Sequence, residues 1–100
     1  MSWASQYIKQ LGAGEEVSFR PKGNSMTGKI ESGQLCTLSP NVSNLATHDI
    51  VLCRVKGAHY LHLISAIKGS PPKYQISNNK KHVNGWISKS AIFGKLIKID

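Results

Sequence analysis

The chain has 100 residues, of which 40% are hydrophobic, 13 are Lys or Arg and 5 are Asp or Glu, so its formal net charge is +8. This length predicts one domain spanning residues 1–100, with a single modest core. No apolar run is long enough to cross a membrane, and the N-terminus lacks the basic-then-apolar order of a secretory signal. We therefore expect a soluble, cytoplasmic protein with no membrane partner.

Residues 2–11 predict one short helix, because Trp3, Tyr7 and Leu11 fall near one face and Gly12 can end it. After Gly14 the pattern changes to short strands separated by turn residues. We expect strands at 17–19, 35–38, 49–55, 59–67, 74–77, 86–87 and 91–99, with polar loops at 40–48 and 78–85. The expected fold is mostly β, with six to eight strands closed as a barrel or coiled sheet.

The cysteines and histidines show no metal-binding pattern. Cys36 and Cys53 each lie in an apolar, strand-like run, which is typical of reduced core thiols. The four histidines are scattered without metal-ligand spacing, so no metal and no cofactor is expected. The positive charge is spread along the chain and no nucleic-acid-binding motif accompanies it, so nucleic acid is an allowed partner but not a favoured one.

The segment Gly23-Asn24-Ser25-Met26 is a candidate nucleophile turn, in which a serine hydroxyl faces a cleft. Strand alternation puts His62 on the same face as Tyr60 and Ile64. If that face borders the cleft, the neutral imidazole can accept the serine proton near neutral pH, which a serine nucleophile requires. A plain loop serine and a structural histidine are the alternatives.

The order of these motifs resembles the superfamily of LexA-type self-cleaving repressor domains and type I signal peptidases. The family pattern Gly-x-Ser-Met-x-Pro-x-Ile is similar to residues 23–30, with Gly28 in place of the proline. The hairpin that carries the catalytic base in the family corresponds to residues 49–62, and the glycine-containing final strand to residues 92–96. The resemblance covers about residues 17–99 and implies the coiled-sheet, LexA C-terminal-type fold of this superfamily.

The resemblance implies that Ser25 is the nucleophile and that the backbone N–H groups of Ser25 and Met26 form the oxyanion site. His62 stands where most members carry a lysine, as in the serine–histidine signal peptidases of archaea and the endoplasmic reticulum. Those enzymes also use a downstream aspartate. The corresponding stretch here has no carboxylate, so Asn78 is expected to orient the imidazole. The residues expected to line the substrate groove are Asn24 and Trp86.

Three functions remain open. The first is a small serine peptidase that acts on itself or on a partner protein or peptide, and the presence of both Ser25 and His62 favours it. The second is a catalytically weak or inactive domain of the same fold that serves as a binding or homodimerisation module, which the missing carboxylate favours. The third, less favoured, is a basic domain associated with nucleic acid. The architecture would suit a phage or prophage accessory protein.

Overall fold

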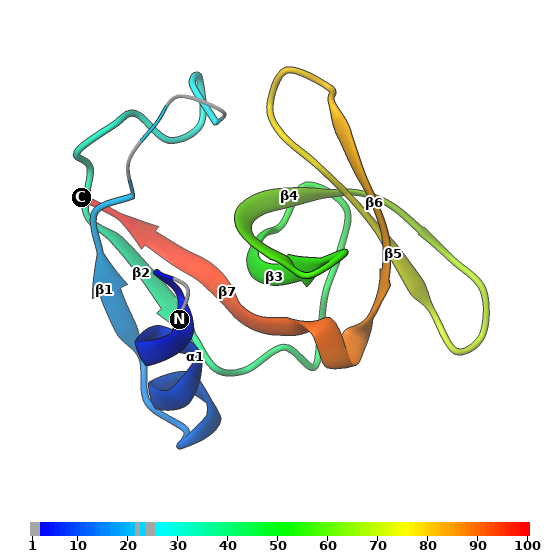
Figure 1. Cartoon of the computed structure of the whole chain (residues 1–100), viewed down its shortest axis with the longest axis horizontal. Helices are drawn as coiled ribbons and strands as arrows, with labels where there is room; N and C mark the ends of the chain where they lie inside the picture. Colours follow the sequence, from blue (N-terminus) through cyan, green and yellow to red (C-terminus); the bar gives the residue numbers. More distant parts are fainter. Residues whose placement is uncertain (1–2, 22, 24–25) are drawn as a thin grey trace.

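All the strands lie in one antiparallel sheet, which curls strongly around its centre (Figure 1). The computed structural model describes residues 3–21, 23 and 26–100. In these residues the elements are α1 (Ser5–Gly12), β1 (Val17–Phe19), β2 (Cys36–Ser39), β3 (Ile50–Val55), β4 (Ala58–Lys68), β5 (Lys73–Ser77), β6 (Val83–Ser88), a short 3₁₀ turn (Lys89–Ala91) and β7 (Ile92–Ile99).

The sheet has the order β1-β2-β7-β3-β4-β5-β6. The mostly β architecture with one short N-terminal helix is therefore confirmed. Two elements begin three residues away from expectation, and the other boundaries agree to within one residue. The helix begins at Ser5, after a turn at Trp3 and Ala4, and β6 begins at Val83 rather than at Trp86. The Asn84-Gly85 pair suggested a turn, but the strand runs through it because Gly85 lies close against Val55 of β3: a Cβ at Gly85 would meet Val55 Cγ1 at 3.1 Å.

The β3–β4 hairpin sets the position of His62. Its two-residue turn, Lys56-Gly57, has φ angles of 50° and 85°, and a two-residue turn with both φ angles positive matches the natural twist of a hairpin. The turn pairs Val55 with Ala58, and the register then places His62 opposite Val51. A local turn signal thus determines which face of the sheet carries the imidazole.

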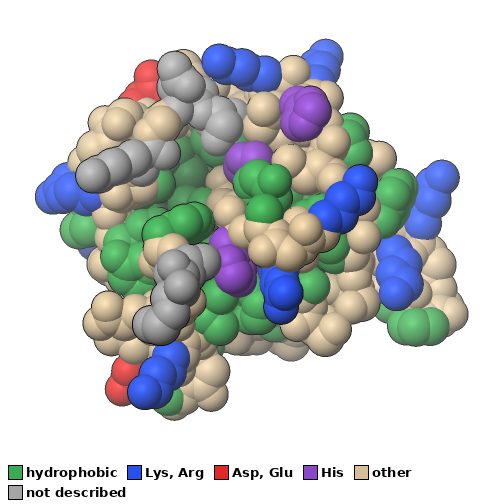
Figure 2. All heavy atoms as spheres, viewed as in Figure 1, with side chains coloured by type: hydrophobic (Ala, Val, Ile, Leu, Met, Phe, Trp, Pro, Cys, Tyr) green, Lys and Arg blue, Asp and Glu red, His purple; other side chains and the backbone are tan. Residues whose placement is uncertain are grey.

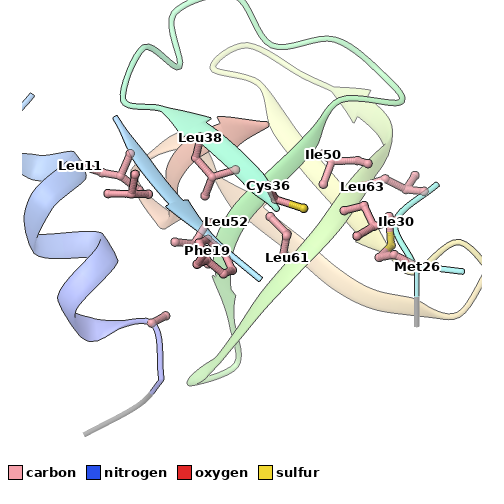
Figure 3. Close-up of a cluster of buried hydrophobic side chains, with 12 residues drawn as sticks. Leu11, Phe19, Met26, Ile30, Cys36, Leu38, Ile50, Leu52, Leu61 and Leu63 are labelled. Carbon is pink, nitrogen blue, oxygen red and sulfur yellow. The ribbon is translucent and has the colours of Figure 1, made fainter. Parts of the chain in front are cut away.

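Alternation along β3 divides the buried side chains into two clusters, one on each face of the sheet. Ile50 and Leu52 belong to the first cluster, while Val51 and Cys53 belong to the second. Figure 3 shows the first cluster, where Leu11 of the helix approaches the sheet at one end and Met26 and Ile30 close the other. Both cysteines are free and buried, as predicted, and burial raises the pKa of the Cys53 thiol to about 12.

Gly94→Ala is expected to lower the free energy of unfolding by about 1–3 kcal/mol, the usual cost of overpacking a core. Helix α1 rests on β7 at this glycine: a Cβ there would meet Leu11 Cδ1 at 2.9 Å and the Ser39 carbonyl oxygen at 3.2 Å. Urea denaturation measures the change. The matched control is Gly12→Ala, where no described atom lies within 4 Å of the new Cβ. An equal loss in both variants would contradict this account of the contact.

Candidate active site

A groove of about 540 Å³ opens between the N-terminal elements and the β4 hairpin. Its aromatic wall comes from α1 and β1, where the rings of Tyr7 and Phe19 stack at 4.5 Å and Trp3 lies 5.7 Å from Phe19. The opposite wall is formed by residues 59–62 of β4. Figure 2 shows hydrophobic and histidine side chains exposed together on this face. The groove is therefore apolar along one side and carries imidazoles on the other.

His62 is the buried titratable group of this groove, with only 7% of its surface exposed. Its ring stacks on Tyr60 at 4.8 Å, and Ile64 packs on that same face of the sheet, as strand alternation predicted. His62 Nδ1 lies 2.7 Å from Asn84 Oδ1 on β6. An amide oxygen can only accept a hydrogen bond. Nδ1 therefore carries the ring proton and donates a hydrogen bond to Asn84 Oδ1. The neutral ring then has its basic lone pair on Nε2, the arrangement that a general base needs.

The environment keeps this imidazole neutral. Burial lowers the pKa of His62 below its ordinary value of 6.5; the hydrogen bond to Asn84 opposes that shift, and the positive charge of His82 adds to it. A base of lowered pKa is unprotonated at neutral pH. The same shift means that the folded state resists protonation of His62, so His62 contributes stability that is present above pH 6.5 and is lost as the pH falls through its folded pKa.

The residue that orients His62 is Asn84, and the prediction of Asn78 is wrong. Asn78 Oδ1 instead accepts hydrogen bonds from the backbone N–H groups of Lys80 and His82, each at 2.9 Å. The amide thus stabilises its own turn, as asparagine commonly does. That turn leads the chain into β6 and so places Asn84, which means that Asn78 acts on the site only through the backbone.

Asn24 and Ser25 lie outside the described residues. Their predicted roles, as groove residue and nucleophile, therefore stay predictions. The residues on either side of them are described. Gly23 and Met26 line the same groove as His62. The Met26 carbonyl accepts hydrogen bonds from the N–H groups of Lys29 and Ile30, at 2.9 and 2.8 Å, which closes a tight turn directly after Ser25. The contribution of the Met26 N–H to an oxyanion site stays a prediction.

The turn after Ser25 is held to the body of the protein from two sides. The side chains of Met26 and Ile30 are buried in the first core cluster, where Figure 3 shows them beside Leu63. On the outer side, Asn79 Nδ2 donates a 2.7 Å hydrogen bond to the Thr27 carbonyl. Gly28 lies close to this contact, since a Cβ there would sit 2.9 Å from Asn79 Nδ2, and its φ angle is 100°. Both the positive φ and the close contact favour glycine at this position.

Trp86 does not line the groove, so that prediction is wrong. Its ring lies on β6, 43% exposed, with Lys68 Nζ 5.8 Å from the ring centroid. The tryptophan of the groove is Trp3, which the sequence pattern placed only on the apolar face of a helix. The turn at Trp3 packs against Phe19 of β1, and this places Trp3 beside Tyr7 of the helix in the groove, a contact that local patterns do not specify.

Two further features of β4 were not predicted. His59 Nδ1 is buried in the groove wall and has no hydrogen-bond partner among the described residues, while its ring packs against Phe93 at 6.1 Å. In addition, β5 pairs with β4 only from Leu63 onward, so the described residues hydrogen-bond positions 58–62 as a strand to β3 alone. A buried polar atom and an open strand edge both have hydrogen-bonding capacity that a bound peptide can satisfy.

The described part of the chain offers no group of three or more His, Cys, Asp or Glu side chains that could hold a metal ion. Asp49, the acidic residue closest to the hairpin in sequence, accepts a hydrogen bond from the Ala46 N–H at 2.8 Å and pairs with Lys95 at 3.5 Å. The Asp49 carboxylate is therefore engaged by Ala46 and Lys95 rather than by a histidine of the groove. Helix α1, the α-helix of the described residues, is too short to cross a membrane.

No family model, no curated protein and no solved structure matches this chain.

Proposed function

We propose that the protein is a small serine peptidase of the LexA and signal-peptidase type, with Ser25 as nucleophile and His62 as general base. The observation that carries the proposal is the 2.7 Å hydrogen bond from His62 Nδ1 to Asn84, which leaves Nε2 as the basic nitrogen of a buried imidazole. The neighbours of Ser25 in the sequence, Gly23 and Met26, line the same groove. A serine turn, an oriented histidine and an apolar groove together make up a peptidase site.

The reaction follows the acyl-enzyme route. Nε2 of His62 takes the proton from Ser25 Oγ as that oxygen attacks the scissile carbonyl, and backbone N–H groups at Ser25 and Met26 stabilise the resulting oxyanion. His62 then returns the proton to the leaving amine, so the C–N bond breaks and an ester on Ser25 remains. Water hydrolyses the ester by the same proton transfers in reverse order. Asn84 holds the imidazolium in position but provides no negative charge to stabilise it.

The groove favours an extended protein or peptide substrate. An edge strand can hydrogen-bond an added peptide strand, and residues 59–62 of β4 lie in the groove wall and have such an edge. The aromatic wall of Trp3, Tyr7 and Phe19 faces them and suits apolar side chains of that peptide. Whether the substrate is another part of this chain or a partner protein is decided by concentration dependence, because self-cleavage within one molecule is first order.

A fluorophosphonate probe tests the nucleophile. We expect one covalent adduct, which intact-mass and peptide mass spectrometry assign to Ser25, and no adduct in Ser25→Ala. The matched control is Ser32→Ala, the same change at an exposed serine of the next turn, which should label like the wild type. Absence of labelling in the wild type, or equal labelling of Ser25→Ala, would contradict the proposal.

A non-catalytic binding or dimerisation module is the second candidate. It is favoured by one observation, the amide at His62 Nδ1 where the related serine–histidine peptidases are expected to carry a carboxylate. In that case the groove would bind a peptide without cleaving it. Peptide binding that is equal in the wild type and in Ser25→Ala, without fluorophosphonate labelling, would support this candidate over the first.

A further inference from the structure

A second, smaller pocket of about 270 Å³ lies on the other side of the turn that follows Ser25. It shares none of its described lining residues with the groove. Lys29 contributes to it from the turn, His48 from the segment before β3, and Lys81 from the loop before β6. Its remaining lining residues are Leu63, Ser65, Ser77, Asn78 and Asn79. The volume is below the usual range of about 300–1,000 Å³ for drug-sized ligands, so it suits a small chemical group.

The lining of this pocket is rich in hydrogen-bond donors and positive charge. Lys29 and Lys81 carry ammonium groups, His48 carries an imidazole, and hydroxyl and amide side chains complete the wall. None of the described residues that line the pocket is acidic. Asp49 is adjacent to His48 in sequence, but its carboxylate is engaged by the Ala46 N–H and by Lys95.

The wider electrostatic setting has the same sign. Between residues 50 and 99 the chain has nine Lys or Arg residues and no Asp or Glu. On the face shown in Figure 2, the acidic side chains lie on the left, where basic side chains also occur, and the charged side chains of the right-hand part are basic. A pocket in such a field attracts anions, and the attraction weakens as the salt concentration rises because Lys29, His48 and Lys81 are exposed.

Two residues of the pocket wall are held in a backbone conformation that non-glycine residues rarely adopt. In the described residues, positive φ angles at non-glycine positions occur at His48 (77°), Lys56 (50°) and Lys81 (69°), and the first and last of these line the pocket. Lys56 lies in the hairpin turn, and Lys81 lies in the turn that Asn78 stabilises. Residues in this region cost conformational energy and cluster at ligand sites, where the backbone angle directs a side chain or N–H to the ligand.

We propose that this pocket binds a phosphate group, held by Lys29 and Lys81 with donors from His48, Ser77 and the Asn78 amide. A tetrahedral dianion can accept several hydrogen bonds at once, and charge-assisted bonds from ammonium groups are the strongest that such a site can offer. The site is independent of the peptidase proposal. It adjoins the Ser25 turn through Lys29, so occupancy would restrain the turn and the 78–82 loop together.

Titration with inorganic phosphate tests this site by NMR, with sodium chloride at equal ionic strength as reference. We expect saturable shifts of the backbone amides of residues 27–30, 48 and 78–82. Lys81→Asn removes the charge with a residue that tolerates positive φ, and should weaken binding about tenfold. Lys29→Gln should do the same. The matched control is Lys56→Asn, the same substitution at a positive φ outside the pocket, which should bind like the wild type.

Several outcomes would overturn the proposal: linear shifts that chloride reproduces, shifts confined to other residues, or equal weakening by Lys56→Asn and Lys81→Asn. Dispersed spectra of each variant establish that it is folded.

Glycerol phosphate and phosphatidic acid vesicles then distinguish a soluble phosphate ester from a lipid headgroup as the source of the phosphate group. Binding of the soluble ester alone indicates a small-molecule phosphate, and vesicle binding that Lys81→Asn abolishes indicates a lipid headgroup. Phosphate binding should persist in Ser25→Ala, so failure of the peptidase proposal leaves this test intact.

Discussion

His62→Ala is expected to lower the rate of peptide hydrolysis by about 10²–10⁴-fold, the usual contribution of a general base. Without Nε2 as proton acceptor, Ser25 keeps its hydroxyl proton and is a poor nucleophile. The loss should fall on kcat more than on KM, because the imidazole acts on the proton in the transition state rather than on substrate binding. Initial rates on a peptide library at pH 7.5 give both quantities.

His62 is also a packing residue, so two controls accompany this variant. His62→Gln keeps most of the volume and removes the base; it should lose activity to a similar extent while melting close to the wild type. His82→Gln changes an exposed histidine of the neighbouring loop and should retain activity. Full activity in a folded His62→Gln variant would show that His62 is not the general base.

Asn84→Asp is expected to raise the rate of hydrolysis by about 10–100-fold. The new carboxylate would lie at the position 2.7 Å from His62 Nδ1 and would stabilise the imidazolium that forms during the reaction. In serine protease triads, replacing the aspartate by asparagine lowers kcat roughly 10⁴-fold, partly because the amide selects the wrong histidine tautomer. The gain expected here is smaller than that factor. Here the amide oxygen already faces Nδ1, so only the charge is added.

The pH profile identifies the cause of this gain. In the wild type, burial lowers the pKa of His62, so kcat/KM should fall only at a pH below 6.5. A carboxylate favours the protonated ring and raises the pKa of His62, so the acid limb of Asn84→Asp should move to higher pH. NMR titration of the His62 ring follows the same shift without substrate.

Two further variants complete the comparison at position 84. Asn84→Ala should reduce activity about tenfold through loss of the hydrogen bond, and Asn44→Asp is the same charge change in an exposed loop. An unchanged acid limb in Asn84→Asp would mean that the residue at position 84 does not act on the proposed base, His62.

Much of the fold could be predicted because its signals are local. The alternation in residues 59–67 placed His62 with Tyr60 and Ile64, and the structure confirms this face. The Lys56-Gly57 turn fixed the hairpin register by its own conformational preference. The start of β6 at Val83 was not predicted, because it depends on a contact between residues far apart in the sequence. Asn84-Gly85 is a strong turn signal, but close packing of Gly85 against Val55 on the distant β3 overrides it.

By itself, the sequence determined the candidate base, the segment that carries the candidate nucleophile, and the mostly β class, since each depends on residue type and on spacing within one element. Only the tertiary structure decided that Asn84 contacts His62, that Trp3 rather than Trp86 lines the groove, and that Lys29 and Lys81 share a pocket. The physical reason lies in the sheet. Bulges at Ile64/Ala66 and Ile76/Ser77 shift the register along β5, and strand curvature then brings β6 to β4. Such contacts depend on the summed geometry of several strands, which no single stretch of residues encodes.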